Sequence, residues 1–149
     1  MQIIPDKIII ESMGVREFSY RTVPQSSIDQ LSTYRFNVDP QLGASREESK
    51  ALVSFIFRIV DEEQQTLVDA KTECLFRVEN MADFISAEDG KVDSMLPTAL
   101  IGIAWSTMRG MLWAVLGNTP YAKVTLPVVD PAEIFEVWRK KMVSQEEEE

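Results

Sequence analysis

LPTALIGIAWSTMRGMLWAVLG, residues 96–117, is a long and largely apolar stretch that corresponds to about six turns of α-helix. Pro97 suits the first turn, where its missing N–H removes no helical hydrogen bond. Gly117 and Asn118, followed by Pro120, are typical of a helix end. We therefore predict one long helix over this range.

A row of small residues recurs at every fourth position of this helix. The row consists of Gly102, Ser106, Gly110 and Ala114. These residues share one helix face, and large apolar side chains occupy the others, which implies burial on more than one side. We expect a sheet of the same chain to cover one side, and a second copy of the chain to pack against the small-residue row.

Two other interpretations of this helix stay open. The stretch is about long enough to span a membrane, although Arg109 near its centre would be costly there. An internal core helix also fits, because small residues can pack on a sheet as well as on another helix. The charged, amphipathic sequence before the helix favours a chain without stable membrane insertion.

The composition limits the kinds of partner that this chain can have. A chain of 149 residues with 45% hydrophobic residues is the size of one domain with a substantial core. Its formal net charge of -9 disfavours nucleic acid and anionic lipid, because both attract basic surfaces. The single cysteine, Cys74, excludes an internal disulfide framework. The first ten residues lack the features of a signal peptide, so we expect a cytoplasmic protein.

Histidine is absent from the sequence, as is any glycine-rich phosphate-binding motif. This absence removes Ser-His-Asp and Cys-His catalysis and zinc-histidine sites. We therefore expect a protein that is not an enzyme and uses no cofactor or metal. The alternative is a small-molecule binder or enzyme that uses the carboxylates of Asp61, Glu62 and Glu73, and it would need a pocket where two of them converge.

Four segments before the long helix are predicted to be strands. They are residues 7–23, 31–39, 51–61 and 66–79. Apolar and polar residues alternate most clearly in the last of these, where Leu75 alone places an apolar side chain on the charged face. Gly14 is expected to mark a bulge or bend in the first strand. Residues 40–50 are expected to form a polar connection.

A shorter helix is predicted after the long one. Asp130 is a suitable N-cap, Pro131 suits the first turn, and Glu133 is the acid that commonly completes the cap. The helix is expected to end near Val143, before an acidic tail over residues 145–149 that we expect to be disordered. Its apolar stripe consists of Ile134, Phe135, Trp138 and Met142.

This order of elements, four strands followed by two helices, predicts an α+β fold. We expect a four-stranded antiparallel sheet with the long helix and the short C-terminal helix packed on one face. Residues 1–144 are expected to form this single domain.

The C-terminal third resembles the SecB family of protein-export chaperones. The resemblance rests on residues 117–120 (GNTP), residues 124–130 (VTLPVVD) and the pair 134–135 (IF). SecB proteins follow their long helix with a glycine, a proline, an extended L-x-L-x-P-V-like segment and a short last helix. In this chain the proline of the extended segment falls one place earlier. The predicted order of bent strand, crossover, three strands and long helix also matches the family.

The resemblance implies both a function and an assembly. SecB-like proteins hold non-native polypeptides unfolded without nucleotide, often for delivery to the export ATPase SecA. The expected partners are therefore unfolded polypeptides or preproteins, SecA, and further copies of the chain in a dimer of dimers whose long helices are sandwiched between the sheets. The resemblance also implies a client groove at Ile28, Leu31, Ile134, Phe135, Trp138 and Met142, and a docking site for the ATPase at Leu75 and Arg77.

Two features depart from the family pattern. Residues 23–31 of the crossover contain no aromatic residue, whereas the family's crossover is rich in them. Arg77 stands where an acidic residue is expected, which weakens charge complementarity with the ATPase. A holdase for many clients is the leading hypothesis, supported by seven methionines whose flexible side chains suit varied apolar sequences. A SecB-like adaptor or antitoxin chaperone with one dedicated client is the alternative.

Overall fold

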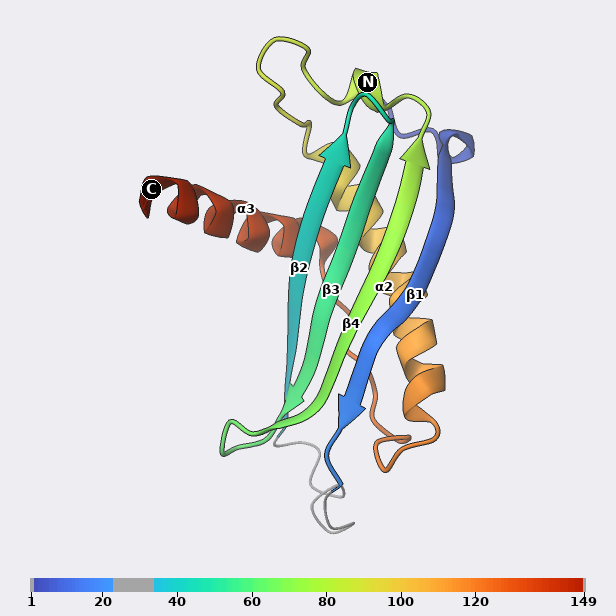
Figure 1. The fold of residues 1–149 in the computed structure, drawn as a ribbon, viewed down its shortest axis with the longest axis vertical. Coiled ribbons are helices and arrows are strands. Elements are labelled where there is room, and N and C mark those ends of the chain that lie inside the picture. Colours follow the sequence, from blue (N-terminus) through green and yellow to red (C-terminus); the bar gives the residue numbers. More distant parts are fainter. Residues whose placement is uncertain (1, 23–33, 149) are drawn as a thin grey trace.

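The computed structural model of the chain describes residues 2–22 and 34–148, with side chains up to residue 146. A four-stranded antiparallel sheet and two α-helices dominate this part of the chain (Figure 1). The strands are β1 (Ile8–Tyr20), β2 (Arg35–Ser45), β3 (Lys50–Val60) and β4 (Thr66–Val78). The helices are α2 (Met95–Leu116) and α3 (Pro131–Glu148), with short 3-10 turns η1 (Pro5–Lys7) before β1 and η3 (Met81–Asp83) after β4.

The strands lie in the order β1-β4-β3-β2, so β2 and β1 form the two edges. Hairpins join β2 to β3 and β3 to β4. The first strand, β1, pairs with β4, which is the last strand along the chain. Register shifts in β1 fall between Ile10 and Ser12 and between Val15 and Glu17. The irregularity predicted for this strand is therefore present, but it flanks Gly14 rather than falling on it.

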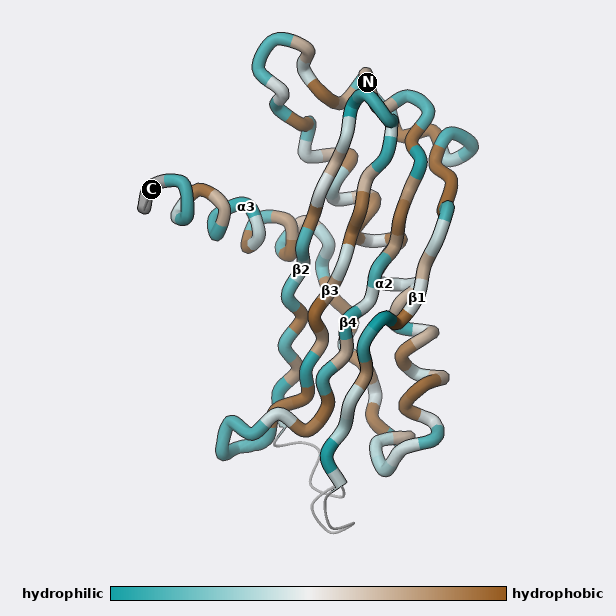
Figure 2. Tube along the Cα trace, in the orientation of Figure 1, coloured by the Kyte–Doolittle hydropathy of each residue, from teal (hydrophilic) through white to brown (hydrophobic). Residues whose placement is uncertain are grey.

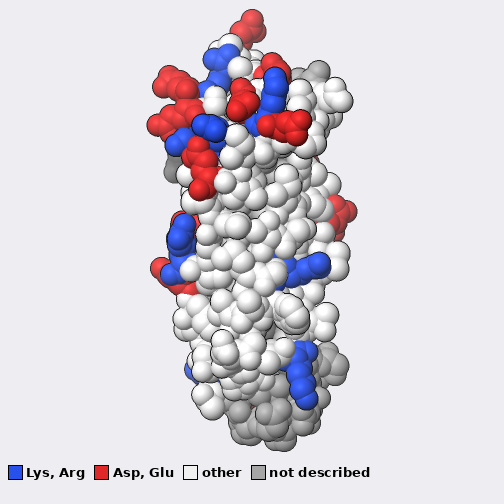
Figure 3. Space-filling view, turned by 90° about the vertical axis from the view of Figure 1, so that its right-hand side faces the viewer, with Lys and Arg blue, Asp and Glu red and all other residues white. Residues whose placement is uncertain are grey.

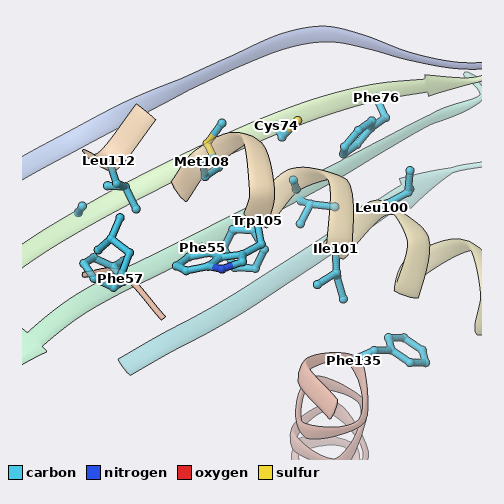
Figure 4. Packing of buried hydrophobic residues seen from close by; sticks show 14 of the residues in the cluster. Phe55, Phe57, Cys74, Phe76, Leu100, Ile101, Trp105, Met108, Leu112 and Phe135 are labelled. Carbon is cyan, nitrogen blue, oxygen red and sulfur yellow. The ribbon is translucent and has the colours of Figure 1, made fainter. Parts of the chain in front are cut away.

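The core lies between α2 and the inner face of the sheet. Side chains that alternate along β3 and β4 point at the helix, among them Phe55, Phe57 and Phe76, none of which is exposed (Figure 4). Trp105 of α2 packs edge-to-face on Phe55 with ring centroids 5.5 Å apart. Apolar residues recur along α2 and the strands that it covers (Figure 2). Full burial of each large apolar side chain stabilises the fold by about 1.5–3 kcal/mol.

The long helix is the one element in the described residues that is long and apolar enough to cross a membrane. One of its faces nevertheless forms the core of the domain, because Ile101, Ala104 and Met108 are fully buried. Contact with the sheet accounts for the apolar character of that face. The predicted α+β fold is thus confirmed, with α2 on one face of the sheet and α3 after it.

Two predicted boundaries were wrong. Residues 40–45 were expected to belong to a polar connection, but β2 continues through Pro40 to Ser45. A proline is tolerated there because β2 is an edge strand, where an N–H that would point away from the sheet is not needed. The last helix was expected to end near Val143, but α3 continues to Glu148, so residues 145–148 are helical in this structure. Glutamate is a good helix former, which explains the extension.

The connection after α2 is hydrogen-bonded to the residue that follows the end of β1. The Tyr121 hydroxyl donates a hydrogen bond to the backbone carbonyl of Arg21 at 2.8 Å. The Tyr121 side chain is fully buried, and burial raises the pKa of its phenol, so the hydroxyl remains a donor. This bond joins residues 100 positions apart in sequence and orients the chain for its return along α2.

Burial of Cys74 gives a direct test of the contact between α2 and β4. Burial raises the pKa of the Cys74 thiol to about 11, so only roughly one thiol in a thousand is ionised at pH 8. We expect Ellman's reagent to react slowly with the native protein and rapidly after unfolding in guanidinium. A cysteine introduced by Val128→Cys, at a position that is 85% exposed, should react at once in the same folded protein. Rapid reaction of Cys74 itself would contradict this packing.

Candidate functional site

Helix α3 begins beside the edge strand β2 and extends away from the sheet (Figure 1). The Asp130 carboxylate accepts a hydrogen bond from the Ala132 N–H at 3.0 Å, and the Asp130 carbonyl accepts the N–H of Ile134 at 3.0 Å. The predicted N-cap is therefore confirmed. Farther along, the Lys141 ammonium pairs with the Asp39 carboxylate of β2 at 3.1 Å, which restrains the angle of the helix.

The start of α3 is held in place by the core tryptophan of α2. Trp105 is 3% exposed, and its indole N–H donates to the backbone carbonyl of Pro127 at 3.1 Å. Pro127 lies in the extended connection just before the cap of α3. The same side chain thus fills the core and sets where the last helix leaves the domain.

An apolar groove of about 390 Å³ lies between α3, the N-terminal half of α2 and the β2–β3 hairpin. We call it the Trp138 groove. Its walls include Leu42, Leu52, Val92, Leu96, Leu100, Phe135 and Trp138. Phe135 and Trp138 stack with ring centroids 6.0 Å apart, and Arg139 is the one charged residue among those lining the groove. A largely apolar hollow with a single cation at its rim can receive apolar side chains of a partner.

A second groove, of about 300 Å³, lies on the other side of α3 and is called here the Val137 groove. Its walls come from β2, the connection before α3, and α3 itself: Phe36, Val38, Pro127, Val128, Val129, Asp130, Glu133, Ile134 and Val137. Helix α3 therefore has a largely apolar hollow on each side of its first half. Its second half leaves the sheet, and Val143 there is 49% exposed.

The residues predicted for a client groove are only partly brought together. Phe135 and Trp138 line the Trp138 groove, and Ile134 lines the Val137 groove instead. Met142 is 36% exposed and lines neither groove. Ile28 and Leu31 lie outside the described residues.

Sequence reasoning missed the opposite wall of the Trp138 groove. Leu42 and Ala44 line the groove because β2 continues past Pro40, where a break was expected. The signal was present, since Val38, Leu42 and Ala44 keep the period-two alternation of the strand. Leu96, at the start of α2, was considered only as part of the predicted long helix.

Leu75 and Arg77 lie on the outer face of the sheet, opposite the face that α2 covers. Leu75 is half-buried and faces Leu52 in register on β3. The Arg77 guanidinium lies 3.8 Å from the Glu11 carboxylate, and the Lys50 ammonium lies 3.3 Å from the same carboxylate. The outer face at this end thus combines a leucine pair with two cations that share one acid.

The small-residue row of α2 is not uniformly open. Gly102 is covered by the chain itself, because a Cβ at this position would lie 3.3 Å from Cγ of Pro131. Ser106, Gly110 and Ala114 are exposed, and a Cβ at Gly110 would meet nothing within 4 Å. Part of the row is therefore explained within one chain, and the rest is free surface.

The surface around β1 and α2 carries few charges despite the acidic composition. In the view of Figure 3, charged side chains gather at one end of the molecule and the middle is largely uncharged. Exposed apolar side chains in these two elements include Met13 of β1, 48% exposed, and Trp113 of α2, 66% exposed.

The carboxylates considered for catalysis do not converge. The Asp61 carboxylate accepts the N–H groups of Glu63 and Gln65, each at 2.9 Å, and so stabilises the β3–β4 turn. Glu62 is exposed in that same turn, and Glu73 pairs with Arg16 on the outer face of the sheet at 3.3 Å. Among the described residues, no three His, Cys, Asp or Glu side chains lie close enough to hold a metal ion.

Comparison with solved structures identifies the fold as SecB-like. The chain is similar to the Mycobacterium tuberculosis SecB-like chaperone Rv1957, solved in complex with a ChAD peptide from the HigA1 antitoxin. The TM-score is 0.57 at 12% sequence identity, over 83% of this chain and 91% of that one. A Streptococcus agalactiae protein of unknown function covers 81% of this chain and 97% of its own, at 15% identity and a TM-score of 0.35. No family model matches the chain, and no curated protein matches it.

The hydrogen bond from Trp105 can be tested against a matched tryptophan on the same helix. Trp105→Phe leaves the Pro127 carbonyl without its donor and opens space in the core, so we expect a loss of about 2 kcal/mol in the free energy of unfolding. Trp113→Phe, at a position that is 66% exposed, should change it by less than about 0.5 kcal/mol. Urea unfolding measures both, and hydrogen exchange should show α3 loosened first in Trp105→Phe. Equal losses would contradict the proposed anchoring.

Proposed function

We propose that this protein is a holdase that binds apolar segments of non-native polypeptides without nucleotide. The observation that carries the proposal is the Trp138 groove, an apolar hollow between a projecting helix and the sheet edge. The SecB-like fold and the absence of converging catalytic groups in the described residues support the same class of function. A cytoplasmic location is part of the proposal.

The chemistry of the groove favours loose specificity. Apolar walls reward burial of many side chains in proportion to the area that they remove from water, without demanding one sequence. Because the chain carries a net charge of -9, basic clients should associate faster than acidic ones at low salt.

An aggregation assay with an unfolded model client tests this function. We expect the protein at equimolar concentration, without nucleotide, to suppress aggregation of the client. Trp138→Ala removes one wall of the groove and should weaken client binding about tenfold or more, as large aromatic anchors typically do. Val143→Ala, on the same helix but outside both grooves, is the control and should behave as the unaltered protein. If Trp138→Ala still suppresses client aggregation fully, clients bind elsewhere than the Trp138 groove. If the unaltered protein does not suppress aggregation, the proposed holdase function is wrong.

A dedicated client is the second candidate function on the same fold. The solved SecB-like neighbour holds a peptide from an antitoxin, which favours this candidate. Pull-down of the tagged protein distinguishes the two, because a dedicated adaptor should return one abundant partner and a general holdase many.

We also propose that SecA docks through Leu75 and Arg77. Glu11 partly neutralises Arg77 and Lys50, but the cluster keeps more cations than acids. This cluster would complement an acidic surface on the ATPase. The acidic residue that the family pattern has in place of Arg77 would complement a basic one.

We further propose that copies of the chain assemble through the exposed part of the small-residue row, as in a dimer of dimers. Gly110→Leu is the sharpest variant, because a Cβ at this exposed position meets nothing within 4 Å in the described residues, so the substitution should leave the fold intact. We expect light scattering to report a smaller particle for Gly110→Leu, with unchanged circular dichroism. Ala132→Leu, at an exposed position on α3, serves as the control. An unchanged mass would place the interface elsewhere.

A further inference from the structure

A third groove, of about 610 Å³, lies on the side of the connection that faces the C-terminal half of α2. We call it the Trp113 groove. The residues that line it are Arg109, Gly110, Trp113, Ala122, Lys123, Val124, Thr125, Leu126 and Val128. Trp113 is 66% exposed and Val128 is 85% exposed, so both apolar side chains are open to a partner.

The connection along this groove has backbone donors without acceptors. Residues 124–130 have no regular secondary structure. Val124 and Leu126 are buried, whereas Thr125 and Val128 point outward. Within the described residues, the backbone N–H groups of Thr125, Leu126, Val128 and Val129 have no hydrogen-bond acceptor.

Successive N–H groups of an extended segment point to opposite sides. The Pro127 carbonyl is already held by Trp105, and Leu126 and Val128 line the groove whereas Val129 does not. An added strand can therefore supply acceptors to the N–H groups of Leu126 and Val128.

The charged residues at the groove indicate which peptides would bind there. Arg109 and Lys123 both line it, and neither forms an ion pair with a described residue. None of the described residues that line the groove is acidic. In a chain of net charge -9, this is a local positive site, and it complements carboxylates.

We propose that the Trp113 groove binds an extended polypeptide segment rich in acidic side chains, which adds as a strand along residues 125–128. Backbone hydrogen bonds supply the affinity, Trp113 and Val128 contact alternate apolar side chains, and Arg109 and Lys123 pair with the carboxylates. The inference rests on the proposed function only in that the occupant is an unfolded polypeptide. It differs in mode, because the Trp138 groove recognises apolar side chains and this groove recognises backbone and negative charge.

An eight-residue peptide of alternating valine and glutamate is the probe. In the unaltered protein, we expect the amide protons of Leu126 and Val128, which line the groove, to exchange more slowly with solvent when the peptide is bound. The same peptide with N-methyl groups at alternate backbone positions should bind about tenfold or more weakly, because it cannot complete the strand pairing. A peptide with lysine in place of glutamate should bind weakly for reasons of charge.

Protein variants separate the two sources of affinity. Val128→Pro removes one backbone donor and should weaken binding of the glutamate peptide more than Val128→Thr does, because Val128→Thr keeps that donor. Arg109→Gln combined with Lys123→Gln should cost about tenfold and abolish the preference over the lysine peptide. Lys140→Gln, an exposed cation on α3, is the matched control for charge.

The outcomes distinguish this inference from the holdase function. Unchanged amide exchange, or equal binding of the N-methylated peptide, overturns the strand addition even if Trp138→Ala still impairs client holding. Conversely, peptide binding that survives in Trp138→Ala supports a separate site. If replacing Glu146 to Glu149 by glutamine makes the amides of Leu126 and Val128 exchange faster without peptide, the acidic end of this chain already fills the groove, and the external occupant is wrong.

Discussion

The contact of Trp105 with the inner face of the sheet is the interaction on which the rest of this structure depends. Its ring packs on Phe55 in the core, and its N–H holds the Pro127 carbonyl. A single buried side chain thereby fixes both the position of α2 on the sheet and the path of the connection to α3. Both grooves beside α3 depend on that path, because it sets where the helix begins beside β2 and α2.

The connection between the helices has two chemically different sides. Toward β2 and α3 it contributes side chains to the largely apolar Val137 groove. Toward the C-terminal half of α2 it lies beside two cations that have no ion-pair partner among the described residues. A short irregular segment thus separates a surface suited to apolar side chains from one suited to a charged, extended backbone. Gly110 borders this second surface and also belongs to the small-residue row, so assembly and peptide binding would compete for adjacent parts of α2.

Patterns with a strong local cause were predicted well from the sequence. The alternation along β4, the length of α2 and the cap at Asp130 all appear in the structure within a residue or so of the expected place. The continuation of β2 through Pro40 was missed, because tolerance of proline depends on whether a strand lies at a sheet edge, and strand order is not a local property. The end of α3 was missed because a run of like charges favours disorder, whereas each glutamate by itself is a good helix former.

The sequence by itself determined the fold class, the inner face of each central strand, and the apolar character of both helices, since these follow from periodicities of two and of about three and a half residues. Only the tertiary structure decided which small residues of α2 are free, because Gly102 is covered by Pro131 from far along the chain. It also decided that the apolar stripe of α3 divides between two grooves, and that the N–H groups of residues 125, 126, 128 and 129 have no acceptor among the described residues. Each of these facts depends on the path of a connection whose residues carry no periodic signal.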